Sequence, residues 1–173
     1  MDSVSLRKIA YDKLLANLED MLKQYRQLLD LVRKEKDLLI TSNIEQLNEN
    51  NTQKELAITK IKALDALRMN YASELAHAVQ ADSVQPRLLE IAQKMGGPEA
   101  ERLRTLQAAL EMVIKRLSEI NKNNTVYAES ALKTVGTALD KFKDLLTGPK
   151  NYQNKGKYKK SSDSSGHLVK KEA

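Results

Sequence analysis

Three long stretches of this chain repeat their apolar residues at alternating spacings of three and four. This spacing places the apolar side chains on one face of a helix and is typical of helices that pack side by side in a shallow supercoil. No stretch shows the alternation of apolar and polar residues that a half-buried strand requires. The three rows are Leu14, Leu18, Met21, Tyr25, Leu28 and Val32; Ala57, Ile61, Leu64, Tyr71, Leu75 and Ala78; and Leu103, Leu106, Leu110, Val113, Leu117 and Ile120.

Breaks rich in polar residues, Gly and Pro divide the chain into four predicted helices. We expect them at residues 3–40, 44–81, 87–95 and 99–146. Ser42 is expected to cap the second helix with Glu45 as its capping-box partner, and Pro86 is expected in the first turn of the third. Short connections favour antiparallel neighbours. The predicted fold is therefore all-α, an elongated antiparallel helical bundle of three long helices plus one short helix.

The apolar row of the last helix changes direction after Asn124. Consecutive steps of four through Asn124, Ala128 and Leu132 turn the row away from the seam that precedes it. Gly136 costs about 1 kcal/mol of helix stability relative to Ala, which favours a labile element. We interpret residues 126–146 as an amphipathic, mobile segment that packs on the bundle or opens for a partner protein. Its stripe consists of Leu132, Val135, Leu139, Phe142 and Leu146.

Two polar residues, Asn121 and Asn124, stand three apart on one face of the same helix. One interpretation is a buried polar residue that fixes the register between helices. The other interpretation is that these polar residues stand at the point where a partner-binding segment leaves the bundle. Glu35 also falls on an apolar row, where we expect it to be partly exposed or paired with a Lys.

The positive charge belongs to the C-terminal end of the chain. Residues 147–173 hold seven Lys against one Asp and one Glu, which is +5 of the formal net charge of +6. The preceding helical domain, residues 1–146, is nearly neutral and has no nucleic-acid signature. The Lys-, Ser- and Gly-rich tail cannot bury enough apolar surface to offset its ordering entropy, so we expect a disordered basic tail.

Candidate catalytic chemistry is sparse. The chain has no Cys and only two His residues, of which His77 lies in a helix and His167 in the tail, so a metal site, a cofactor site or an acid–base pair is not expected. No phosphate-binding or nucleophile motif occurs, and we predict no enzyme activity. The chain opens without a signal sequence and has no apolar run that would insert stably in a membrane, which favours a cytoplasmic protein.

Three motifs together resemble the FlgN family of flagellar type III export chaperones. The first resembles the family's hydrophobic spacing and consists of Leu28-Leu29-x-x-Val32-x-x-Glu35, Leu39, Asn43, Ile44-x-x-Leu47, Lys54-Glu55, Ile61, Leu64 and Arg68. The second, Leu117-x-x-Ile120-Asn121-x-x-Asn124, is similar to the family's L-x-x-L-N-x-x-N. The third, Tyr152-Gln153-Asn154-Lys155-Gly156, is similar to its Y-x-x-x-G.

The resemblance implies a bacterial cytoplasmic protein that binds hook–filament junction subunits before export. It would shield their C-terminal coiled-coil segments from premature self-association and deliver them to the export gate. The family's substrate contact is associated with its C-terminal region, here the stripe after Asn124, and Tyr152 with Gly156 matches the motif used in docking to the gate. The alternatives are a coiled-coil scaffold or adaptor without an export role, and a nucleic-acid-associated protein that uses its basic tail.

Overall fold

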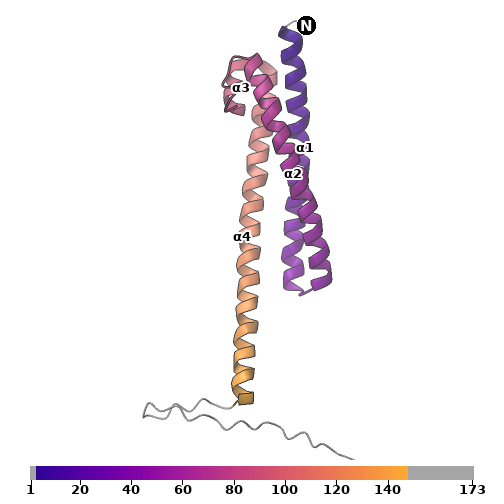
Figure 1. The fold of residues 1–173 in the computed structure, drawn as a ribbon, viewed down its shortest axis with the longest axis vertical. Coiled ribbons are helices and arrows are strands. Elements are labelled where there is room, and N and C mark those ends of the chain that lie inside the picture. Colours follow the sequence, from indigo (N-terminus) through magenta and orange to yellow (C-terminus); the bar gives the residue numbers. More distant parts are fainter. Residues whose placement is uncertain (1–2, 148–173) are drawn as a thin grey trace, which may run out of the picture. The chain divides into compact units, whose positions relative to one another are not determined.

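The protein consists of helices throughout the part of the chain that the structure describes. This computed structural model describes residues 3–147 and contains α1 (Ser3–Ile40), α2 (Ile44–Ala78), α3 (Leu88–Met95) and α4 (Gly97–Thr147) (Figure 1). Within these residues no strand is present. The expectation of an all-α fold with three long helices and one short helix is confirmed. The predicted disordered tail lies outside the described residues except for its first residue, Thr147.

The turn between α1 and α2 corrects one prediction. The cap of α2 is Asn43, whose side chain accepts a hydrogen bond from the backbone N–H of Gln46 at 3.1 Å. Ser42 was expected in this role with Glu45. Ser42 instead takes the left-handed conformation at the end of α1, with φ of 53°, and the capping residue needs an extended conformation or one close to it. The cap therefore moves one residue along the chain.

The connection between α2 and α3 starts earlier than expected. The prediction extended the second helix to residue 81, but α2 ends at Ala78 and Gln80 is left-handed, with φ of 58°. Asp82 then organises the connection, because its Oδ1 accepts hydrogen bonds from the backbone N–H groups of Val84 at 2.9 Å and Gln85 at 3.1 Å. These two hydrogen bonds hold the pKa of Asp82 below its ordinary value.

The start of α3 and the start of α4 also differ from the expected positions. Pro86 was expected in the first turn of a helix, but it is buried and precedes Arg87, the N-cap of α3. Helix α4 begins at Gly97 rather than at residue 99. Gly96 and Gly97 both have positive φ, 63° and 70°, which glycine adopts without steric cost. Pro98 lies in the first turn of α4, where its missing N–H has no helical partner to lose.

Side-chain contacts between α1 and α2 show that these helices run antiparallel. Lys13 Nζ of α1 lies 3.3 Å from Glu74 Oε2, near the end of α2. Asn50, near the start of α2, donates to the carbonyl of Leu31 at 3.1 Å, close to the end of α1. The two helices thus form a hairpin closed by the turn at Asn43.

Helix α4 runs parallel to α1. Arg7 Nη2 of α1 contacts Glu99 Oε2 near the start of α4 at 3.4 Å. Asn124, twenty-five residues later in α4, donates to the carbonyl of Val32 at 2.8 Å. Since α2 is antiparallel to α1, it is also antiparallel to α4. This is the arrangement of a three-helix bundle, with α3 as the short element between α2 and α4.

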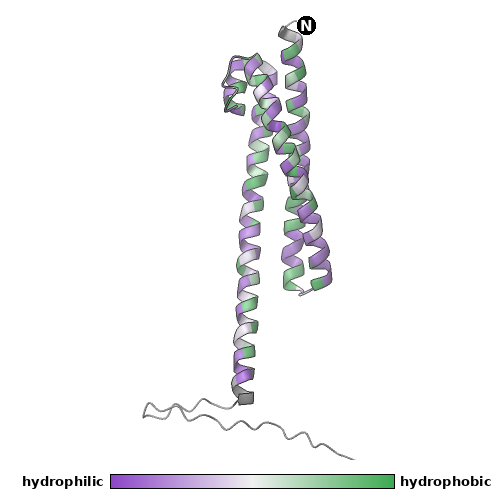
Figure 2. Cartoon of the chain, in the orientation of Figure 1, coloured by the Kyte–Doolittle hydropathy of each residue, from purple (hydrophilic) through white to green (hydrophobic). Residues whose placement is uncertain are grey.

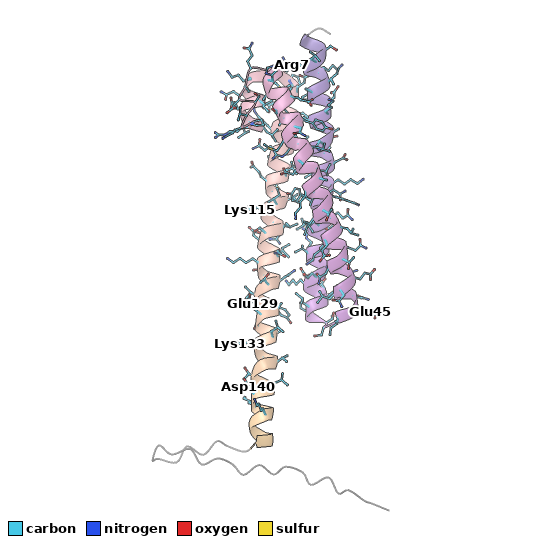
Figure 3. All side chains as sticks on the ribbon, viewed as in Figure 1. Arg7, Glu45, Lys115, Glu129, Lys133 and Asp140 are labelled. Carbon is cyan, nitrogen blue, oxygen red and sulfur yellow. The ribbon has the colours of Figure 1, made fainter. Side chains whose placement is uncertain are left out.

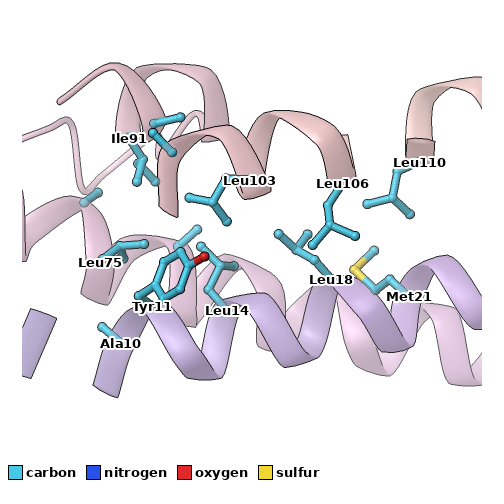
Figure 4. Close-up of a cluster of buried hydrophobic side chains, with 14 of the residues drawn as sticks. Ala10, Tyr11, Leu14, Leu18, Met21, Leu75, Ile91, Leu103, Leu106 and Leu110 are labelled. Atoms are coloured by element: carbon cyan, nitrogen blue, oxygen red, sulfur yellow. The ribbon is translucent and has the colours of Figure 1, made fainter. Parts of the chain in front are cut away.

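The main hydrophobic core joins all four helices and follows the three predicted rows. Figure 4 shows Leu103 and Leu106 of α4 pointing toward Leu14 and Leu18 of α1. Ile91 of α3 is fully buried in the same cluster. The core consists of Ala10, Tyr11, Leu14, Leu18, Met21, Leu22, Ala72, Leu75, Ala76, Ile91, Ala92, Ala100, Leu103, Leu106 and Leu110. At about 1.5–3 kcal/mol for each fully buried aliphatic side chain, this cluster is the main source of stability.

A second cluster extends the packing toward the hairpin turn. Leu28 and Val32 of α1 and Ala57 and Ile61 of α2 are buried together, with Leu117 and Ile120 of α4 partly buried against them. Burial along the α4 row therefore decreases from Leu103 toward Ile120. The chain divides into two compact units, residues 1–131 and 132–173, and the described part of the second is the last part of α4. The predicted domain boundary at residue 146 stays a prediction.

Candidate functional site

The C-terminal part of α4 carries an apolar stripe that nothing in the described chain covers. The exposed fractions are 72% for Leu132, 56% for Val135 and 63% for Leu139. Every other described side chain from residue 129 onward is exposed as well. Apolar positions recur along this part of α4 in Figure 2. Large apolar side chains that share one exposed helix face are typical of a protein-binding surface.

The structure describes the other predicted site residues only in part or not at all. Phe142 and Leu146 belong to α4, and their spacing from Leu139 continues the same face, but their side chains are outside the described part. Tyr152 and Gly156 lie outside the described residues altogether. We call the five residues Leu132, Val135, Leu139, Phe142 and Leu146 the C-terminal stripe.

Burial of α4 against the hairpin ends at Asn124. Asn124 lies against Val32 of α1. The side chains that follow it in the first unit, residues 125–127 and 129–131, are exposed. Exposure of α4 therefore begins at residue 125, within the first unit.

A polar cluster formed by Glu35, Lys54 and Asn124 joins three helices just before that point. Lys54 Nζ of α2 forms an ion pair with Glu35 Oε1 of α1. Asn124 Nδ2 of α4 donates to Glu35 Oε2 at 3.1 Å as well as to the carbonyl of Val32. The side chains of Glu35 and Lys54 are only 14% and 17% exposed, so the pair is largely shielded from water. We call these three residues the Glu35 cluster.

Asn121 and Asn124 occupy different environments although they are three residues apart. Asn124 is 4% exposed, whereas Asn121 is exposed and its carbonyl accepts a hydrogen bond from the hydroxyl of Thr125 at 3.0 Å. A contact between helices is thus present at Asn124 and not at Asn121. A register role for either residue stays a prediction.

Sequence reasoning missed two buried asparagines that make the same kind of contact. Asn17 of α1 donates to the carbonyl of Leu64 at 3.1 Å, and Asn50 of α2 donates to that of Leu31. Both are at most 5% exposed. A signal was available, because Asn17 follows Leu14 by three residues and precedes Met21 by four, which places it on the same helix face as the first apolar row.

A broad, open recess lies among the four helices at the other end of the first unit. Its volume is about 710 Å³, and its lining includes Met21, Tyr25, Arg68, Leu89 and Ile114. Burial raises the pKa of Tyr25, and the nearby carboxylate of Asp65 raises it further. No group of three metal-ligating side chains occurs among the described residues. We take the C-terminal stripe as the stronger candidate, because its large apolar side chains share one exposed helix face.

Comparison with protein families settles what kind of protein this is. The family model described as FlgN protein matches residues 1–160. The chain belongs to the FlgN family. FlgN proteins are flagellar export chaperones and not enzymes, and the interpretation of this chain as a scaffold without an export role is set aside.

Membership of the FlgN family covers both the bundle and the segment that carries the C-terminal stripe, since the match extends past α4. Tyr152 and Gly156 also fall inside the matched range. Comparison with curated proteins and with solved structures finds no match. Among the described helices none is long and apolar enough to cross a membrane.

Proposed function

We propose that this FlgN protein binds hook–filament junction subunits in the cytoplasm through the C-terminal stripe, prevents their premature self-association and delivers them to the export gate. The observation that carries the proposal is the exposure of Leu132, Val135 and Leu139 on one face of α4. Exposure of an apolar helix face to water is unfavourable, so covering that face with an amphipathic helix of a partner is favourable.

The kind of partner follows from the surface. The stripe repeats at spacings of three and four, so it is complementary to another helix with an apolar seam of the same period. Junction subunits are polymerising proteins whose coiled-coil segments have such seams, according to the family resemblance. Covering that seam with α4 would keep the subunit from pairing with other subunits before export.

Charge substitutions in the stripe test this proposal. We expect the double variant Leu132→Asp, Leu139→Asp to bind a junction subunit of the source organism at least a hundredfold more weakly, since each Leu buried in the complex contributes about 1.5–3 kcal/mol. Isothermal titration calorimetry on the full chain gives the affinity. Helicity measured by circular dichroism should be unchanged, because neither side chain is packed in the bundle.

The matched control is Met112→Asp. Met112 is on the same helix and is also 72% exposed, but it lies outside the stripe. This control should bind the subunit as wild type does. Unchanged binding by the double variant, or equal loss in the control, would contradict the proposal, and so would global unfolding of the double variant.

We further propose that Tyr152 contacts the export gate. The residue stands in the polar sequence Lys150-Asn151-Tyr152-Gln153-Asn154, and an isolated aromatic ring can contribute about 2–3 kcal/mol if a partner pocket encloses it. We expect Tyr152→Ala to retain its thermal stability and its affinity for the junction subunit but to lower secretion of that subunit. Secretion at the wild-type level, with equal chaperone abundance, would show that Tyr152 has no docking role.

A further inference from the structure

A block of lysines follows the C-terminal stripe directly in the sequence. Residues 148–160 contain five Lys and neither Asp nor Glu, whereas the preceding 146 residues are nearly neutral. A concentration of positive charge of this kind is complementary to a negatively charged surface. We call these residues the lysine block, which consists of Lys150, Lys155, Lys157, Lys159 and Lys160.

The helix that precedes the lysine block has lysines on both borders of its apolar face. Lys143, four residues after Leu139, borders the C-terminal stripe on one side. On the other side Ala138 widens the apolar face, and Lys141 follows it three residues later. Asp140, which Figure 3 labels on this part of α4, lies between the two lysines on the polar face. All of these side chains are exposed. Lysines at the borders of an apolar face can lay their aliphatic stems along that face while their ammonium groups reach phosphate groups.

This part of α4 has the length and charge of a helix that lies on a membrane and does not cross one. Residues 132–147 are about 24 Å long, and five charged residues interrupt their sequence. A helix that crosses a bilayer needs about twenty predominantly apolar residues. An amphipathic helix that lies in the plane of the bilayer instead buries only its apolar face, about 5–10 Å deep. The exposed C-terminal stripe is available for such burial.

We propose that residues 132–160 bind the surface of a bilayer rich in anionic phospholipids. The C-terminal stripe enters the headgroup region, and the lysine block contacts the phosphate groups. Apolar burial and charge attraction reinforce each other because the stripe and the lysine block adjoin in the sequence. Tyr158, between Lys157 and Lys159, adds an aromatic ring of the kind that is enriched at membrane interfaces.

The combination of charge with an apolar face favours a bilayer over nucleic acid. DNA or RNA also attracts lysines. Contacts to a phosphate backbone, however, come from charged groups and hydrogen-bond donors, so they leave the aliphatic side chains of the stripe without a partner. A bilayer uses both features at once. The inference concerns a lipid surface, goes beyond the proposed function and does not depend on which subunit the protein exports.

Vesicles of defined composition test the proposal with the full-length protein. We expect wild type to float with vesicles made of equal amounts of phosphatidylcholine and phosphatidylglycerol, and to bind vesicles of phosphatidylcholine alone about tenfold or more weakly. Raising the salt from about 50 to about 500 mM should weaken binding to the anionic vesicles by about tenfold, because salt screens the lysines.

Charge removal from the lysine block tests which lysines bind. A variant with four Lys→Gln substitutions, at Lys155, Lys157, Lys159 and Lys160, should bind the anionic vesicles about a hundredfold or more weakly, since each lysine near an anionic surface contributes about fivefold. The matched control has the same net charge and carries Lys→Gln at four exposed lysines of the bundle, which are Lys34, Lys62, Lys94 and Lys122. This control should bind the vesicles as wild type does.

A single tryptophan tests whether the stripe enters the bilayer, because the natural chain has no Trp. The emission of Leu139→Trp should shift to shorter wavelength when anionic vesicles are added, since the indole ring moves from water into the headgroup region. Met112→Trp is the control. Met112 is exposed on the same helix but lies outside the stripe, and the emission of this variant should not change.

Several outcomes would overturn the inference. These are no binding of wild type to the anionic vesicles, equal binding by the lysine-block variant and wild type, equal loss in the bundle control, and unchanged emission of Leu139→Trp. Binding of a single-stranded RNA oligonucleotide without binding of vesicles would identify nucleic acid as the partner and also overturn it.

Binding of a junction subunit separates this inference from the proposed function. The lysine-block variant should keep its affinity for the subunit, because the stripe is intact. The variant Leu132→Asp, Leu139→Asp should lose the vesicles, because its stripe carries two charges. If this variant loses the vesicles but still binds the subunit, the proposed function fails and the membrane inference stands.

Discussion

At the scale of single residues, buried asparagines form the polar contacts between the helices of this bundle. Three buried asparagines each donate to a backbone carbonyl of a facing helix, and two of those carbonyls, on Leu31 and Val32, are adjacent in α1. Helix α1 is therefore contacted from α2 by Asn50 and from α4 by Asn124 at the same height. Replacing one of these asparagines by Leu would remove its contact to the facing backbone, and we expect a loss of about 1 kcal/mol of stability for each hydrogen bond.

The ion pair of the Glu35 cluster makes a prediction at this scale. Lys54→Met should lower the free energy of unfolding by about 1–2 kcal/mol, since the Glu35 carboxylate would stay shielded from water without its cation. Urea denaturation followed by circular dichroism measures the change. Lys60→Met, at an exposed position on the same helix, is the control and should have little effect. Equal effects of the two substitutions would show that the pair does not stabilise the bundle.

At the scale of helices, the sequence predicted that four helices exist and in which order. It predicted the residues at which they begin and end less accurately. The apolar rows identified the helices because burial follows the helical period. The helix ends depended on backbone conformations that sequence alone does not display, such as the left-handed Ser42 that moved the cap to Asn43. The exposure of Leu132 depended on contacts between segments distant in the chain, which the sequence alone does not display.

The turn after α2 gives a prediction about pH. The pKa of Asp82 is lowered by the hydrogen bonds from Gln85 and Val84, so its contribution to stability is present above its ordinary pKa near 3.8 and is lost as the pH falls through the lower folded value. Asp82→Ala should therefore be less stable than wild type at pH 7, and the difference should shrink at low pH. Thermal unfolding of both proteins, measured from pH 7 down to below pH 3.8, tests this prediction.

Asp82→Asn is the matched control, because it keeps the oxygen that accepts both hydrogen bonds and does not titrate. It should remain more stable than Asp82→Ala at every pH. A difference between wild type and Asp82→Ala that is independent of pH would contradict the assigned role of the carboxylate.

At the scale of the whole molecule, one helix runs through both compact units. Residues 100–124 of α4 complete the core of a three-helix bundle, whereas the side chains of residues 132–141 are exposed. The sequence indicated this division through the change in the apolar row after Asn124. For a FlgN chaperone, we propose that the first part supplies a stable body and the second part a binding surface.

Hydrogen exchange of the full-length protein tests this account most directly. In the free protein, amides in residues 100–120 of α4 should exchange slowly and those in residues 132–147 rapidly, because only the former belong to a packed core. A saturating amount of a junction subunit should slow exchange in residues 132–147 and leave residues 100–120 unchanged. Protection that appears instead at the recess around Leu89 and Ile114, with none at residues 132–147, would contradict the account.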